Sequence, residues 1–346
     1  MHNNTHAAPG KDSSMDERGF AAVVGHNDII EHLQNATKSG KISHAYLFTG
    51  EPGSGKKLMA TLFATLLQCE KGRANPCMKC ASCKKALSQN HPDIIMVTHE
   101  KPNIISVKEI RDQVVNTVDI KPYESRYKIY IINEAEKMNA QAQNALLKTI
   151  EEPPAYAIIM LLASTPDALL STILSRCVRL NLKTVSDKDV REYLINEMHL
   201  PDYEAEVATA FAQGNIGRAQ EAASGDTFAN LADRTVKIIK DIDKLQIYEI
   251  VEVVKELSEE KNNIDDFLDI LLLWFRDVLL YKATRETDNL VFRRELSEIR
   301  REASVCSYEG LQEIIDSIEK AKTRLHANVN FDLTLELLFL TIAENM

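Results

Sequence analysis

Short apolar runs and longer amphipathic segments alternate along the first half of the chain. Apolar runs of strand length occur at residues 45–49, 94–97, 129–132, 158–163 and 178–182. Between them, apolar residues recur at helical spacing, most clearly over residues 29–39, 56–68, 107–118 and 140–151. Uninterrupted apolar runs are typical of strands buried on both faces, and their alternation with helices favours a parallel sheet. The pattern therefore predicts an α/β domain in which helices cover both faces of a parallel five-stranded sheet.

The pattern changes at about residue 184, after which strand-like runs cease. Ser186 is expected to cap a helix that continues to residue 197, and a second helix is expected over residues 202–213. From about residue 228 the chain reads as long amphipathic helices without proline. We therefore expect four parts. These are a polar disordered extension at residues 1–19, the α/β domain at residues 20–183, a small helical domain at residues 184–227 and a larger C-terminal helical domain at residues 228–346.

The composition is that of an ordinary globular protein, with 45% hydrophobic and 27% charged residues. Neither an apolar run of about 18 residues nor an apolar N-terminal leader is present, so we expect a cytoplasmic protein without a membrane partner. Residues 1–180 carry 21 basic and 18 acidic side chains, whereas residues 181–346 carry 20 and 33. Any contact with nucleic acid is therefore expected in the first half, and the acidic second half is expected to be solvated or to bind protein.

A glycine-rich loop follows the first expected strand and precedes an expected helix. Residues 50–57 read GEPGSGKK, which matches the phosphate-binding P-loop in its proper strand–loop–helix context. Gly50, Gly53 and Gly55 would let backbone N–H groups turn toward a phosphate, and Lys56 stands where the phosphate-binding lysine belongs. The alternative is a glycine-rich turn that binds no phosphate.

Two positions that normally hold Mg²⁺ at such a loop have changed. The hydroxyl residue after the lysine is replaced by Lys57, which has no acceptor for a metal. The strand at 129–132 ends in Asn133 where a carboxylate normally coordinates Mg²⁺, although Glu134 remains where a water-activating carboxylate would sit. The sequence therefore predicts that this chain alone neither binds Mg²⁺ nor hydrolyses ATP, so that Glu134 is vestigial. Binding of ATP or phosphate without metal stays open.

Four cysteines are spaced C-x₇-C-x₂-C-x₂-C, at Cys69, Cys77, Cys80 and Cys83. Four thiolates complete the tetrahedral shell of Zn²⁺ and leave no position for a reacting water, which predicts a structural zinc module at residues 69–83. Free thiols and an iron–sulfur cluster are the alternatives. Basic residues that could contact DNA or simply be solvated surround the cysteines, and these are Lys71, Arg73, Lys79, Lys84 and Lys85.

The segments NEAEKMNAQAQNALLKTIEEPP from Asn133 and LLASTPDALLSTILSRC, ending at Cys177, carry a family resemblance. They resemble the delta-prime family of bacterial DNA polymerase III clamp-loader subunits, which are AAA+ proteins related to the gamma/tau subunits. The resemblance begins near Val24, extends to the end of the chain and is strongest over residues 43–182. It implies a place with gamma/tau and delta subunits in a five-membered ring that loads a sliding clamp on primed DNA. It also implies that residues 184–227 form a helical lid and residues 228–346 an oligomerisation collar.

The resemblance also implies roles for individual side chains. Arg176, in the triplet Ser-Arg-Cys, would be an arginine finger that reaches the ATP of a neighbouring subunit, since its planar charged fork suits phosphate oxygens. The alternative is a surface arginine paired with a local carboxylate. Thr165, with Ser164 before it, would contribute the polar sensor group at the end of a strand, or else hydrogen bonds in the loop. Arg218 would contact phosphate from the lid, or else be solvated.

Two other functions stay open. The first is an ATP-hydrolysing motor subunit of the gamma/tau type, in which Glu134 acts with a water-held Mg²⁺. The second is a zinc-bearing DNA-binding adaptor outside any ring. Turnover of ATP by the purified chain would favour the first, whereas salt-dependent DNA affinity without subunit association would favour the second.

Overall fold

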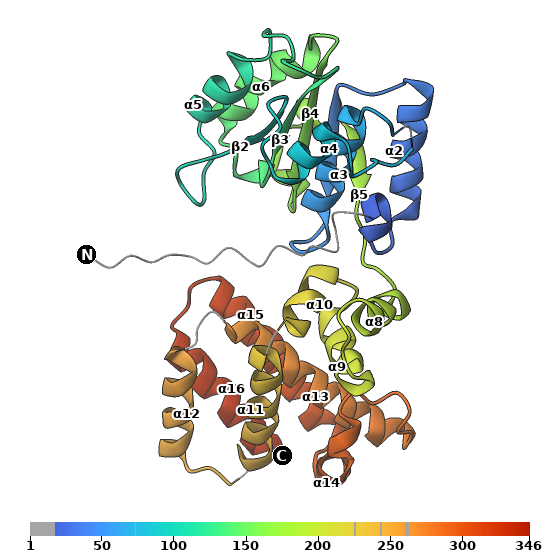
Figure 1. The fold of residues 1–346 in the computed structure, drawn as a ribbon. Coiled ribbons are helices and arrows are strands. Elements are labelled where there is room, and N and C mark those ends of the chain that lie inside the picture. The colour runs from blue at the N-terminus through green and yellow to red at the C-terminus, as the bar shows by residue number, and fades with distance from the viewer. Residues whose placement is uncertain (1–17, 73, 225, 243, 260–262) are drawn as a thin grey trace, which may run out of the picture. The chain divides into compact units, whose positions relative to one another are not determined.

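The computed structural model describes residues 18–346, with the exception of residues 73, 225, 243 and 260–262 (Figure 1). These residues form two compact units, each of which is described by itself. The first unit comprises the chain up to Asp189 together with Asn215–Gly217, and the second comprises Val190–Gly214 and Arg218–Met346. Of the disordered extension expected at residues 1–19, residues 1–17 lie outside the part of the chain that the structure describes. Gly19–Ala22 form a short 3-10 helix, η1.

The core of the first unit is a parallel sheet of five strands. The strands are β1 Ala45–Thr49, β2 Ile94–Val97, β3 Lys128–Ile132, β4 Ala157–Ala163 and β5 Val178–Asn181. Their order across the sheet is β2-β3-β4-β1-β5, and every pairing is parallel. All residues of β1, β3 and β4 are buried, as expected for central strands covered on both faces. The predicted α/β fold class is therefore confirmed.

Helices cover both faces of this sheet (Figure 1). On one face, Leu47 and Ile132 belong to an apolar core completed by α5 (Val107–Ile110) and α6 (Ala140–Glu151). On the other face, Phe48 and Ile131 form a second core with α2 (Asn27–Ser39) and α3 (Lys56–Gln68). Successive residues of a strand point to opposite faces, so each apolar run contributes to both cores.

The helix expected over residues 107–118 is interrupted. It is α-helical only to Ile110 and continues as a π-helix, η2, over Arg111–Val115. Ile110, Val114 and Val118 are all buried on the sheet side. In an α-helix, two residues that are four positions apart differ in direction by about 40°, because four residues turn the helix by slightly more than one full turn. A π-helix has more residues per turn, which offsets this difference. The π-helical segment thus keeps these three residues, spaced four apart, on the face that packs against the sheet.

The second unit contains only helices among its described residues. These are the end of α8 Asp187–Asn196, α9 Asp202–Ala212, α10 Ile216–Ala223 from Arg218 onward, α11 Asp226–Ile242, α12 Ile247–Glu259, α13 Ile264–Thr284, α14 Leu296–Val305, α15 Tyr308–His326 and α16 Phe331–Asn345, together with the short η6 Arg293–Glu295. The longest of them, α13, carries Trp274, which is fully buried and donates its Nε1–H to Glu302 Oε2 at 2.7 Å. No helix built from the described residues is long and apolar enough to cross a membrane.

Candidate nucleotide-like site and metal centre

The P-loop and two further loops meet at one edge of the sheet. The strands β3, β4 and β1 are neighbours, so the loops that leave their carboxyl ends lie side by side. These loops carry Asn133, Ser164 and the segment that begins at Gly50. The structure thus brings Asn133, Ser164 and the glycine-rich loop to one edge of the sheet.

Lys56 is held by protein groups of its own loop and of the next strand end. Its Nζ donates to the carbonyl oxygens of Gly50 at 2.6 Å and Glu51 at 2.7 Å, and to Ser164 Oγ at 3.1 Å. An ammonium group has three N–H donors, so these contacts use all of them. Burial lowers the pKa of Lys56. A phosphate could engage this lysine only if it displaced one of these acceptors.

A short segment of the same unit packs on the glycines of the loop. Asn215 Nδ2 donates to Pro52 O at 2.7 Å, and Gly217 N donates to Gly53 O at 3.0 Å. Gly53 has a φ of +81°, and a Cβ there would lie 2.5 Å from Asn215 Oδ1. Gly53 is therefore required both by its left-handed backbone and by the close approach of residues 215–217.

The two altered Mg²⁺ positions offer no carboxylate to a metal. Lys57 is exposed in the first turn of α3, and Asn133 follows β3 directly. The carboxylate of Glu134 forms an ion pair with Lys137 at 2.7 Å and lies 3.7 Å from His99 Nε2. Mg²⁺ is bound in proteins mainly by carboxylates together with phosphate oxygens, and the carboxylate of Glu134 is already paired with a lysine.

Two residues assigned by the resemblance lie in other surroundings. Thr165 is exposed before the 3-10 turn η4 (Pro166–Ala168), whereas its neighbour Ser164 contacts Lys56. Arg218, in the second unit, forms an ion pair with Asp269 at 2.5 Å and stands 4.3 Å from the centroid of the Phe211 ring. Within its own unit, Arg218 therefore has a structural role that links helices.

Arg176 lies at the surface of the first unit, between the short helix α7 (Ser171–Leu174) and β5. Its Nη2 lies 2.9 Å from Glu151 Oε1, and its Nη1 donates to Thr172 O at 3.0 Å. The side chains of Arg176 and Glu151 are 41% and 44% exposed. The local carboxylate that the sequence left open as an alternative is thus present, in a solvated pair that contributes little to stability.

The four predicted cysteines converge on one point, and their sulfur atoms all lie within 4.8 Å of one another. A tetrahedral zinc site with bonds of about 2.3 Å separates its sulfurs by about 3.8 Å, and Cys77 Sγ lies 4.0 Å from Cys83 Sγ. Cys69 follows the end of α3, whereas Cys80 caps the short helix α4 (Ala81–Leu87) and Cys83 lies in its first turn. The cluster could therefore bind a metal ion such as zinc.

Backbone N–H groups point at three of these sulfurs. Cys69 Sγ accepts from Gly72 N at 3.0 Å and Cys77 N at 3.3 Å, and Cys80 Sγ accepts from Cys83 N at 3.4 Å. Cys77 Sγ accepts from Cys80 N at 3.4 Å. Such donors favour thiolates, and the N–H of Lys79 is the main cause that lowers the pKa of Cys77 to about 6. Burial instead raises the pKa of Cys83, and a cation bound by the four sulfurs would supply the positive charge that favours its thiolate. Arg73, one of the basic residues expected here, lies outside the described residues.

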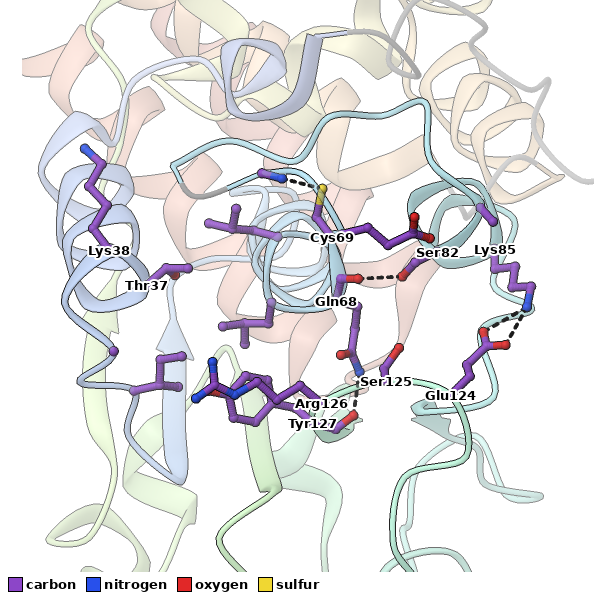
Figure 2. A pocket seen from close by; sticks show the side chains of 17 residues that line it. Thr37, Lys38, Gln68, Cys69, Ser82, Lys85, Glu124, Ser125, Arg126 and Tyr127 are labelled. Carbon is purple, nitrogen blue, oxygen red and sulfur yellow. Dashed lines mark hydrogen bonds and ion pairs between the residues drawn. The ribbon is translucent and has the colours of Figure 1, made fainter.

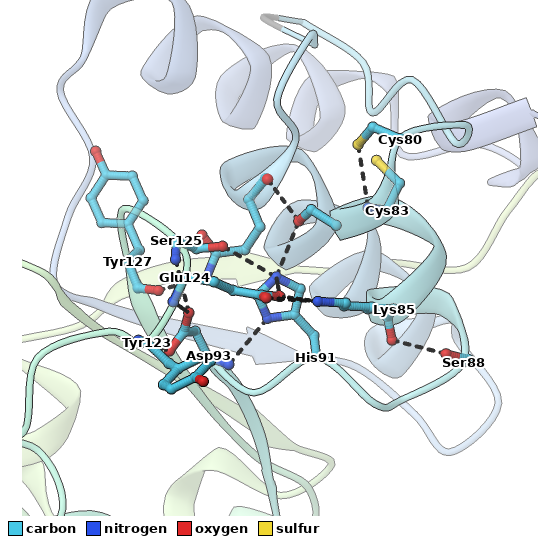
Figure 3. Close-up of polar contacts among 12 residues, drawn as sticks. Cys80, Cys83, Lys85, Ser88, His91, Asp93, Tyr123, Glu124, Ser125 and Tyr127 are labelled. Carbon is cyan, nitrogen blue, oxygen red and sulfur yellow. Dashed lines mark hydrogen bonds and ion pairs between the residues drawn. The ribbon is translucent and has the colours of Figure 1, made fainter.

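A buried polar network, which the sequence did not reveal, fastens this module to the sheet (Figure 3). His91 Nδ1 accepts from Asp93 N at 3.1 Å, while its Nε2 lies 3.1 Å from Ser82 Oγ and 3.2 Å from Ser125 Oγ. Ser82, on α4, also donates to Gln68 O at 2.8 Å. Burial lowers the pKa of His91, which favours the neutral ring. Because both ring nitrogens are engaged, His91 serves as a tether and not as a metal ligand.

Asp93 holds the loop that precedes β3. Its buried carboxylate accepts from the backbone N–H groups of Tyr123, Glu124 and Ser125 at 2.6, 2.9 and 3.0 Å. Three convergent N–H donors resemble an anion site in which the anion is a side chain. The loop is thereby fixed beside the cysteine module.

Replacement of Asp93 by alanine is expected to lower the free energy of unfolding of the first unit by about 3 kcal/mol, because three N–H groups lose their acceptor at about 1 kcal/mol or more each. Urea unfolding followed by circular dichroism measures this change. The matched variant Asp167→Ala removes an exposed carboxylate and should change the value by less than about 0.5 kcal/mol. Equal effects of the two variants would contradict the role assigned to Asp93.

A cleft of about 590 Å³ lies next to the cysteine module (Figure 2). Its walls come from the end of α2, the end of α3, the helix α4 and the loop before β3, and they include Lys38, Gln68, Cys69 and Arg126. Of the residues singled out from the sequence, Cys69 and Lys85 line it, and the described lining includes no residue of the glycine-rich loop at 50–57. The cleft is therefore separate from the phosphate loop.

Taken together, the parallel sheet and the glycine-rich loop after β1 define a P-loop-type α/β protein, in which Lys57 and Asn133 stand where Mg²⁺ ligands would be expected. A family model described as "DNA polymerase III, delta subunit" matches residues 25–186, and another described as "DNA polymerase III, delta subunit, C terminal" matches residues 235–344. A delta-prime subunit is 32% identical to this chain over 322 residues, so the chain belongs to the family of DNA polymerase III delta-prime subunits. The predicted resemblance is thus confirmed.

Two relatives and one solved structure illustrate what this chain is similar to. DNA polymerase III subunit delta' of Bacillus subtilis is 32% identical over 322 residues, which cover 91% of this chain and 95% of the relative. Subunit tau of the same organism is 30% identical over 325 residues, which cover 87% of this chain and 57% of tau. Among solved structures, a DNA polymerase III gamma subunit-related protein of Thermotoga maritima aligns with a TM-score of 0.46 at 18% identity, over 91% of this chain and 99% of that one.

Proposed function

We propose that this chain is the delta-prime-type subunit of a replicative clamp loader, which assembles with gamma/tau and delta subunits and helps to load a sliding clamp on primed DNA. The proposal rests on family membership and on the sequence relation to both delta-prime and tau subunits. Related chains in one assembly are expected to pack through equivalent surfaces.

In this proposal the chain does not hydrolyse ATP. The observation that carries this conclusion is the loss of both Mg²⁺ positions, since Lys57 is cationic and Asn133 carries no charge. Two further observations support it. Glu134 is paired with Lys137, and Lys56 is bound to carbonyl oxygens of its own loop. One such feature alone could be compatible with an active site. Here the Mg²⁺ ligands, the water-activating carboxylate and the phosphate-binding lysine are all affected.

The chain would instead supply Arg176 to the ATP of a neighbouring subunit. The guanidinium is at the surface and its carboxylate partner, Glu151, is solvated, so a phosphate could replace that partner at low cost. A planar guanidinium can form two parallel hydrogen bonds with phosphate oxygens. This geometry suits a group that acts across an interface.

Two further parts of the proposal concern structure. The four cysteines would hold a structural Zn²⁺, because four sulfur donors complete its shell. The C-terminal helices would carry assembly. On α16, Leu333 and Leu337 are 53% and 45% exposed and lie one turn apart on one face. Exposed leucines in this arrangement are typical of a helix that packs against another chain.

Comparison of the chain alone with the chain in its assembly tests the proposal. The purified chain is expected to show no ATP turnover above background with Mg²⁺, and to co-purify with gamma/tau and delta subunits. Addition of the clamp and primed DNA should then stimulate the ATPase of the assembly. Turnover by the chain alone would favour the motor subunit, whereas tight salt-dependent DNA binding without subunit association would favour the adaptor.

A further inference from the structure

A carboxylate that sequence analysis did not assign lies beside the phosphate loop. Glu136 is in the 3-10 helix η3 (Ala135–Lys137), which follows β3. Its Oε1 accepts from the backbone N–H of Ser164 at 3.1 Å. Its Oε2 is buried, and the described residues offer it no hydrogen-bond donor.

Ser164 connects this carboxylate to the lysine of the loop. The backbone N–H of Ser164 donates to Glu136, and its hydroxyl accepts from Lys56 Nζ at 3.1 Å. The negative charge of Glu136 also raises the pKa of Lys56, against the larger lowering caused by burial. The lysine therefore already has a compensating anion from its own chain.

We propose that Glu136 weakens the binding of ATP at the phosphate loop, because its carboxylate already provides the negative charge near Lys56 that a bound phosphate would otherwise bring. This inference rests on the proposed loss of ATP hydrolysis and gives that loss a second cause. Triphosphate at this edge would place like charges next to a buried oxygen that has no donor to disperse its charge. The repulsion grows with the number of phosphates, so it opposes ATP more than ADP and leaves AMP nearly unaffected.

Isothermal titration of the purified chain with ATP, ADP and AMP tests the proposal, first without and then with Mg²⁺. In Glu136→Gln the amide oxygen can still accept from Ser164 N, but the charge is gone. The variant is expected to bind ATP about tenfold more tightly than the natural chain, with a smaller gain for ADP and none for AMP. Damage to the fold would weaken binding, so it cannot mimic this result.

Two controls separate the charge of Glu136 from other causes. Glu51→Gln removes an exposed carboxylate that also acts on Lys56, and it should change ATP affinity by less than about twofold because solvent screens it. In the double variant Glu136→Gln with Lys56→Ala, the gain should disappear.

The proposal is overturned if Glu136→Gln binds ATP no better than the natural chain, whether both bind or neither does. A gain that is equal for AMP, or that survives Lys56→Ala, also overturns it. Weaker binding of ATP only when Mg²⁺ is present would identify Glu136 as a metal ligand instead. These titrations need no partner subunit, so their failure leaves the co-purification and turnover experiments intact, and the reverse also holds.

Discussion

Replacement of Arg176 by alanine is expected to slow ATP hydrolysis at the neighbouring site of the assembly by about 10³-fold, the lower end of the range for an arginine supplied in trans. In the proposed role, the guanidinium would stabilise charge that develops on the transferred phosphoryl group, and alanine would remove that stabilisation. Single-turnover hydrolysis in the reconstituted assembly measures the effect at that site. Steady-state turnover falls less wherever other sites continue to work.

The chain itself should stay folded, since the exposed pair between Arg176 and Glu151 contributes at most about 1 kcal/mol. Arg176→Lys keeps the charge without the planar fork and should recover only a small part of the rate. Arg179→Ala is the matched control, because this exposed arginine on β5 donates to Leu174 O and has no role in the proposal. Full single-turnover activity of the Arg176→Ala assembly would remove the finger assignment.

Removal of the metal is expected to have the largest effect on stability. The natural chain should carry one zinc ion, and Cys83→Ser should lose it and destabilise the first unit by several kcal/mol. Zinc binding contributes about 10–16 kcal/mol to the folding of isolated zinc-finger peptides. The effect is expected to be smaller here, because α3 already packs against the sheet without the metal. Metal analysis and thermal unfolding measure the two effects.

Cys177→Ser provides the matched control for this variant. Cys177 lies outside the cluster, and burial raises the pKa of its thiol to about 11, so it is not a thiolate at neutral pH. This variant should retain one zinc ion per chain. A strong chelator should reproduce the effect of Cys83→Ser on the natural chain, and an unchanged unfolding temperature in chelator would contradict a structural metal.

Part of the site could be predicted because its signals are local. The P-loop motif sits between a strand and a helix, and the cysteine spacing lets one short segment present four sulfurs. The predicted helix cap is local as well, since Ser186 Oγ accepts from Asp189 N at 3.2 Å at the start of α8. Each feature depends on residues that are near one another along the chain.

Other contacts join residues that are far apart, and no pattern marks them. Ser164 rather than Thr165 meets Lys56, across 108 positions of sequence. In the sequence, nothing distinguishes Glu136 from an ordinary polar loop residue. Only in the folded chain does the 3-10 helix η3 place its carboxylate where it accepts from Ser164 N. The pairing of Arg176 with Glu151 likewise depends on the end of α6 lying beside α7.

The order of side chains alone determined that this protein has a parallel sheet, a P-loop without its Mg²⁺ ligands and a four-cysteine module, since periodicity and short spacing are properties of the chain itself. Tertiary structure alone decided which charges face one another. The strand order β2-β3-β4-β1-β5 places three loops at one edge, and only there do Lys56, Ser164 and Glu136 come within hydrogen-bonding and electrostatic range. Electrostatic energy depends on distance in space, which the sequence does not state.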